Sequence, residues 1–377
     1  MDLPVVWFVI VAIFWTGFFV LEGFDFGVGA LHRVVGRDDM ERRVAINSIG
    51  PLWDGNEVWL VVAGAAMFAA FPSWYATWFS ALYLALVLVL FSLIIRGVSF
   101  EFRGKSESPR WRGTWSTTLT IGSVLAPLLI GVGLGDLLVG LPVNQSGDFT
   151  GTFWSLLTPY GLLMGATLLL LCLLHGSTFL ALKTDGAVQA RAFATAAQLR
   201  WIALVVVVVE GAWTFALSGR SALSALLGVA GVFGAIGAFR AVGLRRDGWA
   251  FVLTAITIGS TVASVFAGLY PDVLVSSTNP AYSLTVAGAA SSSYALTVMT
   301  WVAVVIFPIV LAYQGWTAYV FRARVSSTAT TTSAPIQSLR RRSEPAAASC
   351  AVGVRRSRRP SRGRTRRGRR RPRSSCP

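Results

Sequence analysis

Charged residues are scarce in this 377-residue chain: Asp, Glu, Lys and Arg make up 13% of it, whereas hydrophobic residues make up 54%. Soluble domains carry about 25% charged residues. The charge is also unevenly placed, because 15 arginines and one acid, Glu344, lie between Ser326 and Pro377, so that this segment carries +14 of the chain's +16. The sequence therefore predicts a membrane-embedded body over residues 1–325 and a basic tail over 326–377.

Histidine and cysteine are also rare, with two and three residues. Their spacing fits neither a zinc nor an iron–sulfur site, and no phosphate-binding glycine motif follows a strand. Cys172 lies in an apolar run and the other two cysteines lie in the tail, so no disulfide framework is expected. A haem held by two histidines would need His32 and His175 on facing helices at one depth. A packing or loop role is favoured for each.

Long apolar runs dominate the body of the chain. A helix needs about 20 apolar residues to cross a bilayer, and nine segments qualify. The first lacks a basic leader and contains acidic residues, so we expect it to remain as a helix rather than to be cleaved. The predicted spans are Val5–Ala30, Asn47–Phe71, Trp74–Val98, Thr114–Leu138, Leu156–Leu182, Trp201–Leu217, Ala222–Ala241, Trp249–Tyr270 and Ala295–Phe321.

Basic residues alternate between the loops. The first, third, fifth and seventh loops each contain several Lys or Arg residues, whereas the even-numbered loops contain almost no charge. Basic loops stay in the cytoplasm. The chain is therefore predicted to be a multi-pass protein of the bacterial plasma membrane, with its N-terminus outside and its C-terminus in the cytoplasm.

The tail from Ser326 is first rich in Ser, Thr and Ala and then in Arg, without any apolar periodicity. Such a segment is expected to be disordered. It could attract anionic lipid or nucleic acid. Its basic residues are all Arg, and its Arg, Ser, Gly and Pro repeats look like out-of-frame reading of GC-rich DNA. We therefore favour a non-functional extension and expect no nucleic-acid partner.

Four carboxyl groups lie within the first two spans. Glu22 and Asp25 are three residues apart, as are Asp54 and Glu57, so each pair shares a helix face. Counted from the basic loop at 1.5 Å per residue, both pairs lie roughly 12 Å inside the cytoplasmic edge. Ionisable groups at such depth are costly and usually functional.

Two interpretations of these carboxyls remain open. They could form a proton relay from the cytoplasm, which the charge placement slightly favours. They could instead be structural, bonding to backbone donors or pairing with a cation such as Arg96. Glu210, near the middle of the sixth span, could face a partner or a cavity, or be hydrogen-bonded inside the bundle. Asp136 is expected at the outer interface.

Two long motifs carry a family resemblance. Gly23-Phe-Asp-Phe-Gly-Val-Gly29 and Asn47-Ser-Ile-Gly-Pro-Leu-Trp-Asp-Gly-Asn-Glu-Val-Trp59 closely resemble subunit II of cytochrome bd quinol oxidases. Shorter matches continue along the chain to about residue 325, and the tail lies outside the likeness. These matches are Phe68–Pro72, Tyr75-Ala76, Arg96–Arg103, the serines between 276 and 293, and Met299–Val305 with Pro308.

The resemblance implies two four-helix bundles plus a peripheral helix. It implies a haem-free subunit beside a subunit I that carries haems b and d and the quinol site, in a complex that reduces dioxygen to water without pumping protons. It places Asp54 on a proton route, Asp25 at another acidic motif position, and argues against haem ligation by His32 or His175. Small accessory subunits and a structural quinone occur in some members.

Two other classes of function use the same residues. A proton-coupled carrier would employ the buried carboxyls to bind substrate, and would have helices broken at midplane in both halves. A scaffold would only shield the haem subunit, and neutralising Asp54 would then leave turnover intact. The motifs favour the oxidase over the carrier, and the choice between proton route and scaffold stays open.

Overall fold

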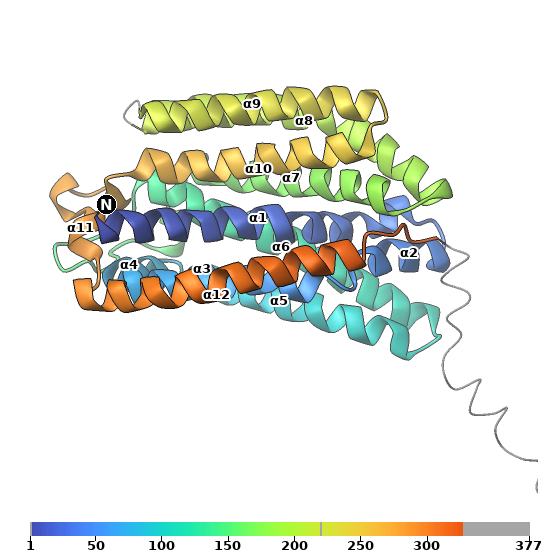
Figure 1. Cartoon of the computed structure of the whole chain (residues 1–377), viewed down its shortest axis with the longest axis horizontal. Coiled ribbons are helices and arrows are strands. Elements are labelled where there is room, and N and C mark those ends of the chain that lie inside the picture. Colours follow the sequence, from blue (N-terminus) through green and yellow to red (C-terminus); the bar gives the residue numbers. More distant parts are fainter. Residues whose placement is uncertain (1, 219–220, 327–377) are drawn as a thin grey trace, which may run out of the picture. The chain divides into compact units, whose positions relative to one another are not determined.

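The computed structural model describes residues 2–218 and 221–326, and over these residues the chain is built almost entirely from helices (Figure 1). The predicted tail falls, apart from Ser326, outside the described residues, and its disorder stays a prediction. In chain order the elements are α1 (Leu3–Val35), α2 (Asp39–Ile49), α3 (Trp53–Ala70), α4 (Pro72–Ala81), α5 (Tyr83–Phe102), η1 (Arg103–Lys105), α6 (Pro109–Val139), η2 (Phe153–Leu156), α7 (Pro159–Lys183), α8 (Gly186–Leu217), α9 (Ala222–Gly243), α10 (Asp247–Leu269), β1 (Asp272–Leu274), η3 (Pro280–Tyr282), β2 (Leu284–Thr285), α11 (Val286–Ala289) and α12 (Ser293–Val320).

The long helices form two groups of four. In the first, α1 packs against α3 and α6, α5 packs against α6, and α4 links α3 to α5. In the second, α7, α8, α9 and α10 pack each on the next, and α10 returns to α7. Helix α12 lies beside α1 and α3 and buries only Leu296 (Figure 1). The prediction of an all-α polytopic protein with two bundles and a peripheral helix is confirmed.

The two groups meet where α1 and α6 pack against α7, and the approach of α1 to α7 is close. A Cβ atom at Gly27 would lie 2.0 Å from the backbone oxygen of Cys172, and one at Gly176 would lie 2.5 Å from the Gly27 backbone. Membrane helices gain little from burying apolar surface, so close backbone approach through small residues is a main source of their packing energy. This crossing holds the C-terminal half of α1, which contains Glu22 and Asp25, in the centre of the protein.

Eight described helices are long and apolar enough to cross a membrane, and they match eight of the nine predicted spans. The prediction of one continuous helix over Asn47–Phe71 is wrong. Helix α2 ends at Ile49, and α3 begins at Trp53 with Asp54 in its first turn. Pro51 contributes to this break, because it has no backbone N–H to continue the helix. The predicted span Trp74–Val98 is likewise interrupted, at Leu82 between α4 and α5.

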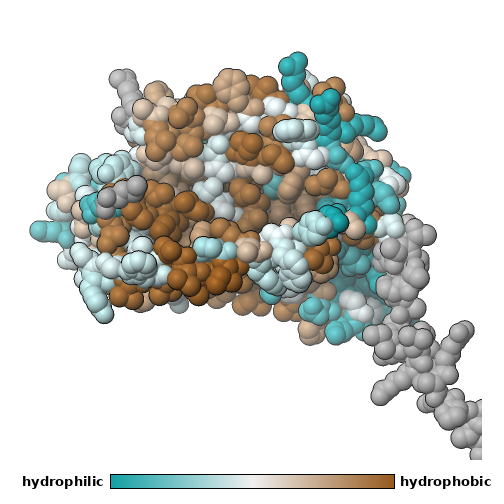
Figure 2. All heavy atoms as spheres, viewed as in Figure 1, coloured by the Kyte–Doolittle hydropathy of each residue, from teal (hydrophilic) through white to brown (hydrophobic). Residues whose placement is uncertain are grey.

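Helix α2 is tied to both bundles at the basic end of the molecule. Its Asp39 pairs with Arg103 at 2.5 Å and with Arg112 at 2.8 Å, at the ends of α5 and α6. Its Glu41 pairs with Arg191 of α8 at 2.6 Å, and this contact lowers the pKa of the Glu41 carboxyl. Figure 2 shows hydrophilic residues gathered at the end where α2 lies and hydrophobic residues across the middle of the visible face.

Candidate functional site

The guanidinium group of Arg96 joins three helices below the break between α2 and α3. Arg96 lies on α5, and its Nη2 is 2.6 Å from Oε1 of Glu22 on α1. Its Nη1 donates to Oε2 of Glu57 on α3 at 2.9 Å. Arg96 and Glu22 are completely buried, whereas the Glu57 side chain is 23% exposed. The cluster therefore runs from the interior of the bundle toward the outer face of α3.

Asp25 adds a second fully buried carboxyl one turn along α1 from Glu22. Its Oδ2 accepts a hydrogen bond from Nδ2 of Asn56 at 2.7 Å, and the same amide group donates to the Leu21 carbonyl at 3.2 Å. The rings of Phe26 and Phe100 lie 4.8 and 5.3 Å from the Arg96 guanidinium carbon. Aromatic faces stabilise a desolvated cation, so the surroundings favour a charged Arg96.

Asp54 occupies a different position from the other three predicted residues. It is exposed on the first turn of α3, and it acts electrostatically on Glu57, one turn further along the helix. The structure thus brings Glu22, Asp25 and Glu57 together around Arg96. Asp54 lies beyond Glu57, at the protein surface. Because Arg96 pairs with two of the four, the structural interpretation of these carboxyls also has a physical basis.

Glu210 is hydrogen-bonded inside the second bundle. Its Oε1 accepts from the Thr214 hydroxyl at 2.5 Å and from the Tyr160 hydroxyl at 3.4 Å, and all three residues are buried. This agrees with the interpretation of Glu210 as a residue bonded within the bundle. Asp136, expected at the outer interface, is instead fully buried, and its Oδ1 accepts from the Thr158 hydroxyl at 2.7 Å.

The two histidines have separate surroundings. The Nδ1 atom of His175 lies 2.7 Å from the Thr254 hydroxyl, its Nε2 lies 3.2 Å from the Val20 carbonyl, and its ring stacks on Phe251. Both ring nitrogens are therefore engaged by protein groups. His32 is fully buried near the end of α1, and its Nδ1 lies 2.7 Å from the Gly29 carbonyl. These contacts fit packing roles rather than a shared haem.

The family model described as "Cytochrome bd terminal oxidase subunit II" matches residues 3–321. The chain belongs to this family. The chain is 41% identical over 324 residues to cytochrome bd ubiquinol oxidase subunit 2 of Bacillus subtilis, covering 85% of this chain and 96% of the relative. It is 37% identical over 348 residues to cytochrome bd-I ubiquinol oxidase subunit 2 of Escherichia coli, covering 82% and 92%.

A solved structure of similar fold is the bd oxidase from Geobacillus thermodenitrificans. It matches with a TM-score of 0.67 at 17% identity, over 85% of this chain and 98% of that chain. Together the comparisons show a multi-pass membrane subunit of the cytochrome bd type. Family membership removes the support for the carrier hypothesis.

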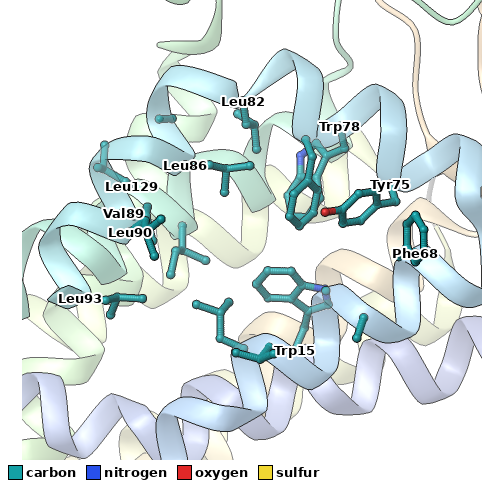
Figure 3. A pocket seen from close by; sticks show the side chains of 17 residues that line it. Trp15, Phe68, Tyr75, Trp78, Leu82, Leu86, Val89, Leu90, Leu93 and Leu129 are labelled. Atoms are coloured by element: carbon teal, nitrogen blue, oxygen red, sulfur yellow. The ribbon is translucent and has the colours of Figure 1, made fainter. Parts of the chain in front are cut away.

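This bd-type subunit also has an apolar pocket of about 480 Å³ between α3, α4 and α5. Figure 3 shows the rings of Trp15, Trp78, Tyr75 and Phe68 along one part of the pocket and leucine side chains, among them Leu86 and Leu93, along another. Phe68 is 61% exposed, so the pocket is open at the surface of the described chain. The indole nitrogen of Trp78 is buried and has no hydrogen-bond partner among the described residues.

Sequence reasoning did not find several of these features. The Trp78 nitrogen lies in a run of aromatic residues that reads as an interfacial anchor, and nothing in that run indicates a pocket. Ser116 and Ser123 on α6 are buried, Ser123 faces Gly29 of α1, and Ser116 accepts from Arg103. Their spacing of seven residues was the one signal that could have placed both on a single helix face.

Proposed function

We propose that this chain is the haem-free subunit of a cytochrome bd quinol oxidase and that it delivers protons from the cytoplasm to a haem-bearing subunit I. In this proposal the complex oxidises quinol and reduces dioxygen to water, and it builds a proton gradient because the protons consumed come from inside, without pumping. Haems b and d of the partner would supply the electron transfer and the oxygen chemistry. This chain would supply the proton path and would pack against the haem-bearing subunit.

The observation that carries the proposal is the charge imbalance around Arg96. One buried cation faces two fully buried carboxyls, Glu22 and Asp25, and the partly buried Glu57. An unpaired charge in so dry a site is costly, so we infer that Glu22 and Asp25 share one proton. A group that holds a proton between two acceptors can pass it on as well as receive it.

We place the exit of the route at the exposed carboxyl. Glu57 is ion-paired with Arg96 and lies one helical turn from the exposed Asp54. Asp54 lies on the face of α3, where a partner subunit could receive a proton from it. The ends of the helices beside α2 carry the basic loops, so we place that end in the cytoplasm and the N-terminus outside.

No haem site is proposed in this chain. Both ring nitrogens of His175 bond to protein groups, and the Nδ1 atom of His32 bonds to its own helix. Neither histidine is therefore proposed as a haem ligand.

The proposal is tested on the complex purified through a tag on this chain. We expect a haem-bearing subunit to copurify, with quinol-dependent oxygen consumption. In vesicles, protons should disappear from the cytoplasmic side in the number needed to form water, and acidification of the outer side should come only from quinol oxidation. Absence of haem from the complex, or additional proton export, would contradict the assignment.

A structural quinone is a second proposal, carried by the pocket of Figure 3. Its lining is apolar and aromatic, which suits a quinone ring and the start of its isoprenoid chain. The Trp78 indole ring forms part of the pocket wall, and a flat quinone ring can stack on such an aromatic face.

We expect Trp78→Leu to lose quinone that copurifies with the complex. The substitution keeps an apolar side chain and removes the aromatic face. Aromatic stacking contributes about 0.5–1.5 kcal/mol beyond the area buried, so occupancy should fall roughly two- to tenfold at limiting quinone. Quinone in organic extracts is measured by chromatography, with Trp213→Leu on α8 as control. Equal quinone in both variants would remove the pocket from consideration.

A further inference from the structure

The turn between α9 and α10 carries positive charge that no carboxylate of the described residues neutralises. Arg240, Arg245 and Arg246 are exposed there, and their side chains form no ion pair or hydrogen bond with other described residues. Asp247 is the only acid within α9, α10 and the turn that joins them, and its carboxylate already pairs with Arg324. The turn therefore presents three unpaired guanidinium groups at the basic end of the protein.

Arg245 occupies a backbone conformation that favours glycine, because its φ is 53°. The Arg246 amide donates to the Ala241 carbonyl at 2.9 Å and the Arg245 amide donates to the Val242 carbonyl at 3.1 Å, which is the Schellman arrangement at a helix end. Glycine is the usual residue at the position of Arg245, since a Cβ atom disfavours a left-handed backbone. Holding a loop in the cytoplasm requires only positive charge somewhere in it, so membrane topology does not account for an arginine at this position.

Large apolar side chains lie exposed beside these arginines. Leu244 is 68% exposed in the turn itself, Trp249 is 62% exposed in the first turn of α10, and Trp201 of α8 is 60% exposed. The ring of Trp201 packs edge-on against Phe239, with 4.4 Å between the ring centroids, so α8 contributes to the same surface. Tryptophan is concentrated at the level of the lipid headgroups. Unpaired cations and apolar groups thus lie together where headgroups meet acyl chains.

This surface lies away from the helix that we propose to face the partner subunit. Figure 1 shows α8 and α9 on the opposite side of α1 from α3 and α12, and Figure 2 shows hydrophilic side chains at the end where α9 meets α10. The guanidinium group of Arg200 on α8 donates to the Phe239 carbonyl at 2.8 Å, so it is engaged inside the protein and is not part of this surface. The remaining arginines of the turn face the lipid.

We propose that the turn between α9 and α10 binds the headgroup of an anionic phospholipid from the leaflet at the basic end of the protein. Guanidinium groups bind phosphate oxygens through paired hydrogen bonds, and Leu244 with the two tryptophans contacts the glycerol and the upper acyl chains. A zwitterionic lipid also has a phosphate, but its ammonium group would lie among unneutralised cations. Charge complementarity therefore selects an anionic lipid. This site does not depend on the proton-delivering function.

The test counts the phospholipids bound to the complete purified complex by native mass spectrometry. The complex is delipidated in detergent and titrated with phosphatidylglycerol or with phosphatidylcholine, and its thermal midpoint is measured without added lipid. One variant is Arg245→Gly, and the other combines Arg240→Gln with Arg246→Gln. The matched control combines Lys105→Gln with Arg110→Gln, which removes two charges between α5 and α6 from exposed residues that also form no ion pair with other described residues.

We expect phosphatidylglycerol to bind roughly fivefold more weakly for each arginine removed, and roughly tenfold or more weakly in the double variant, since each arginine near an anionic lipid contributes about this much. Phosphatidylcholine binding should not change, and the control should match wild type. Arg245→Gly should not lower the thermal midpoint, because glycine suits the φ of that position. A lower midpoint in Arg245→Gly would make this arginine structural and overturn the proposal. Unchanged phosphatidylglycerol binding in both variants, or an equal loss in the control, would overturn it as well.

Discussion

Asp54→Asn should lower quinol-dependent oxygen consumption at least roughly tenfold, since a proton-transfer group contributes about 10²–10⁴-fold, while haem content stays at the wild-type level. Asp54 is exposed on α3 and takes part in no ion pair formed by the described residues. Substitutions at such positions change stability by about 0.5 kcal/mol or less. A loss of activity would therefore report on proton transfer and not on folding.

The comparison needs a charge-matched control on the same side of the protein. Glu101 lies exposed near the end of α5, and Glu101→Gln removes the same charge away from the cluster. Asp54→Glu, which keeps the carboxyl, should retain part of the activity. Normal turnover in Asp54→Asn with normal haem content would support the scaffold hypothesis. Loss of haem together with activity would instead give Asp54 a role in assembly.

The number and order of the helices could be predicted from hydropathy, because the bilayer requires long apolar runs and satisfied backbone groups. The break before Trp53 was not predicted, because the apolar run after it was extended back to Asn47 across Gly50 and Pro51. The sequence has Gly50 and Pro51 at this point, but a short Gly-Pro segment can either kink a helix or end it. The separate helix α2, held by the ion pairs of Asp39 and Glu41, depends on partners on α5, α6 and α8.

The pairing of the carboxyls could be predicted only in part. Helical spacing places Glu22 with Asp25 and Asp54 with Glu57, and Arg96 was a named candidate partner. Spacing does not say which member of each pair faces inward. Both residues on α1 are buried because they face Arg96 on α5 and Asn56 on α3 inside the first bundle, whereas α3 has an open side where Asp54 lies. The burial of Ser123 against Gly29 depends on the packing of α1 on α6, which a single sequence does not encode in any local pattern.

Arg96→Met should be the most damaging single change in the cluster. It leaves Glu22 and Asp25 fully buried without their cation, and removing one partner of a buried ion pair costs about 3–5 kcal/mol. A loss of this size is a large part of the stability of a typical domain. We therefore expect little assembled complex in the membrane and a lower thermal midpoint for what can be purified.

The cause of this loss can be isolated by a second substitution. Arg96→Met combined with Glu22→Gln removes both charges, and replacing a buried ion pair by neutral groups is often nearly harmless, so the double variant should recover much of the yield and the midpoint. The control is Arg200→Met, because Arg200 is another arginine beside an aromatic ring, bonded to the Phe239 carbonyl at 2.8 Å. If the double variant is as unstable as Arg96→Met, packing of the long side chain dominates. If the double variant recovers stability but not proton uptake, neutral groups can replace the structural contribution of the pair but not its part in proton transfer. The charged pair would then be retained for proton transfer.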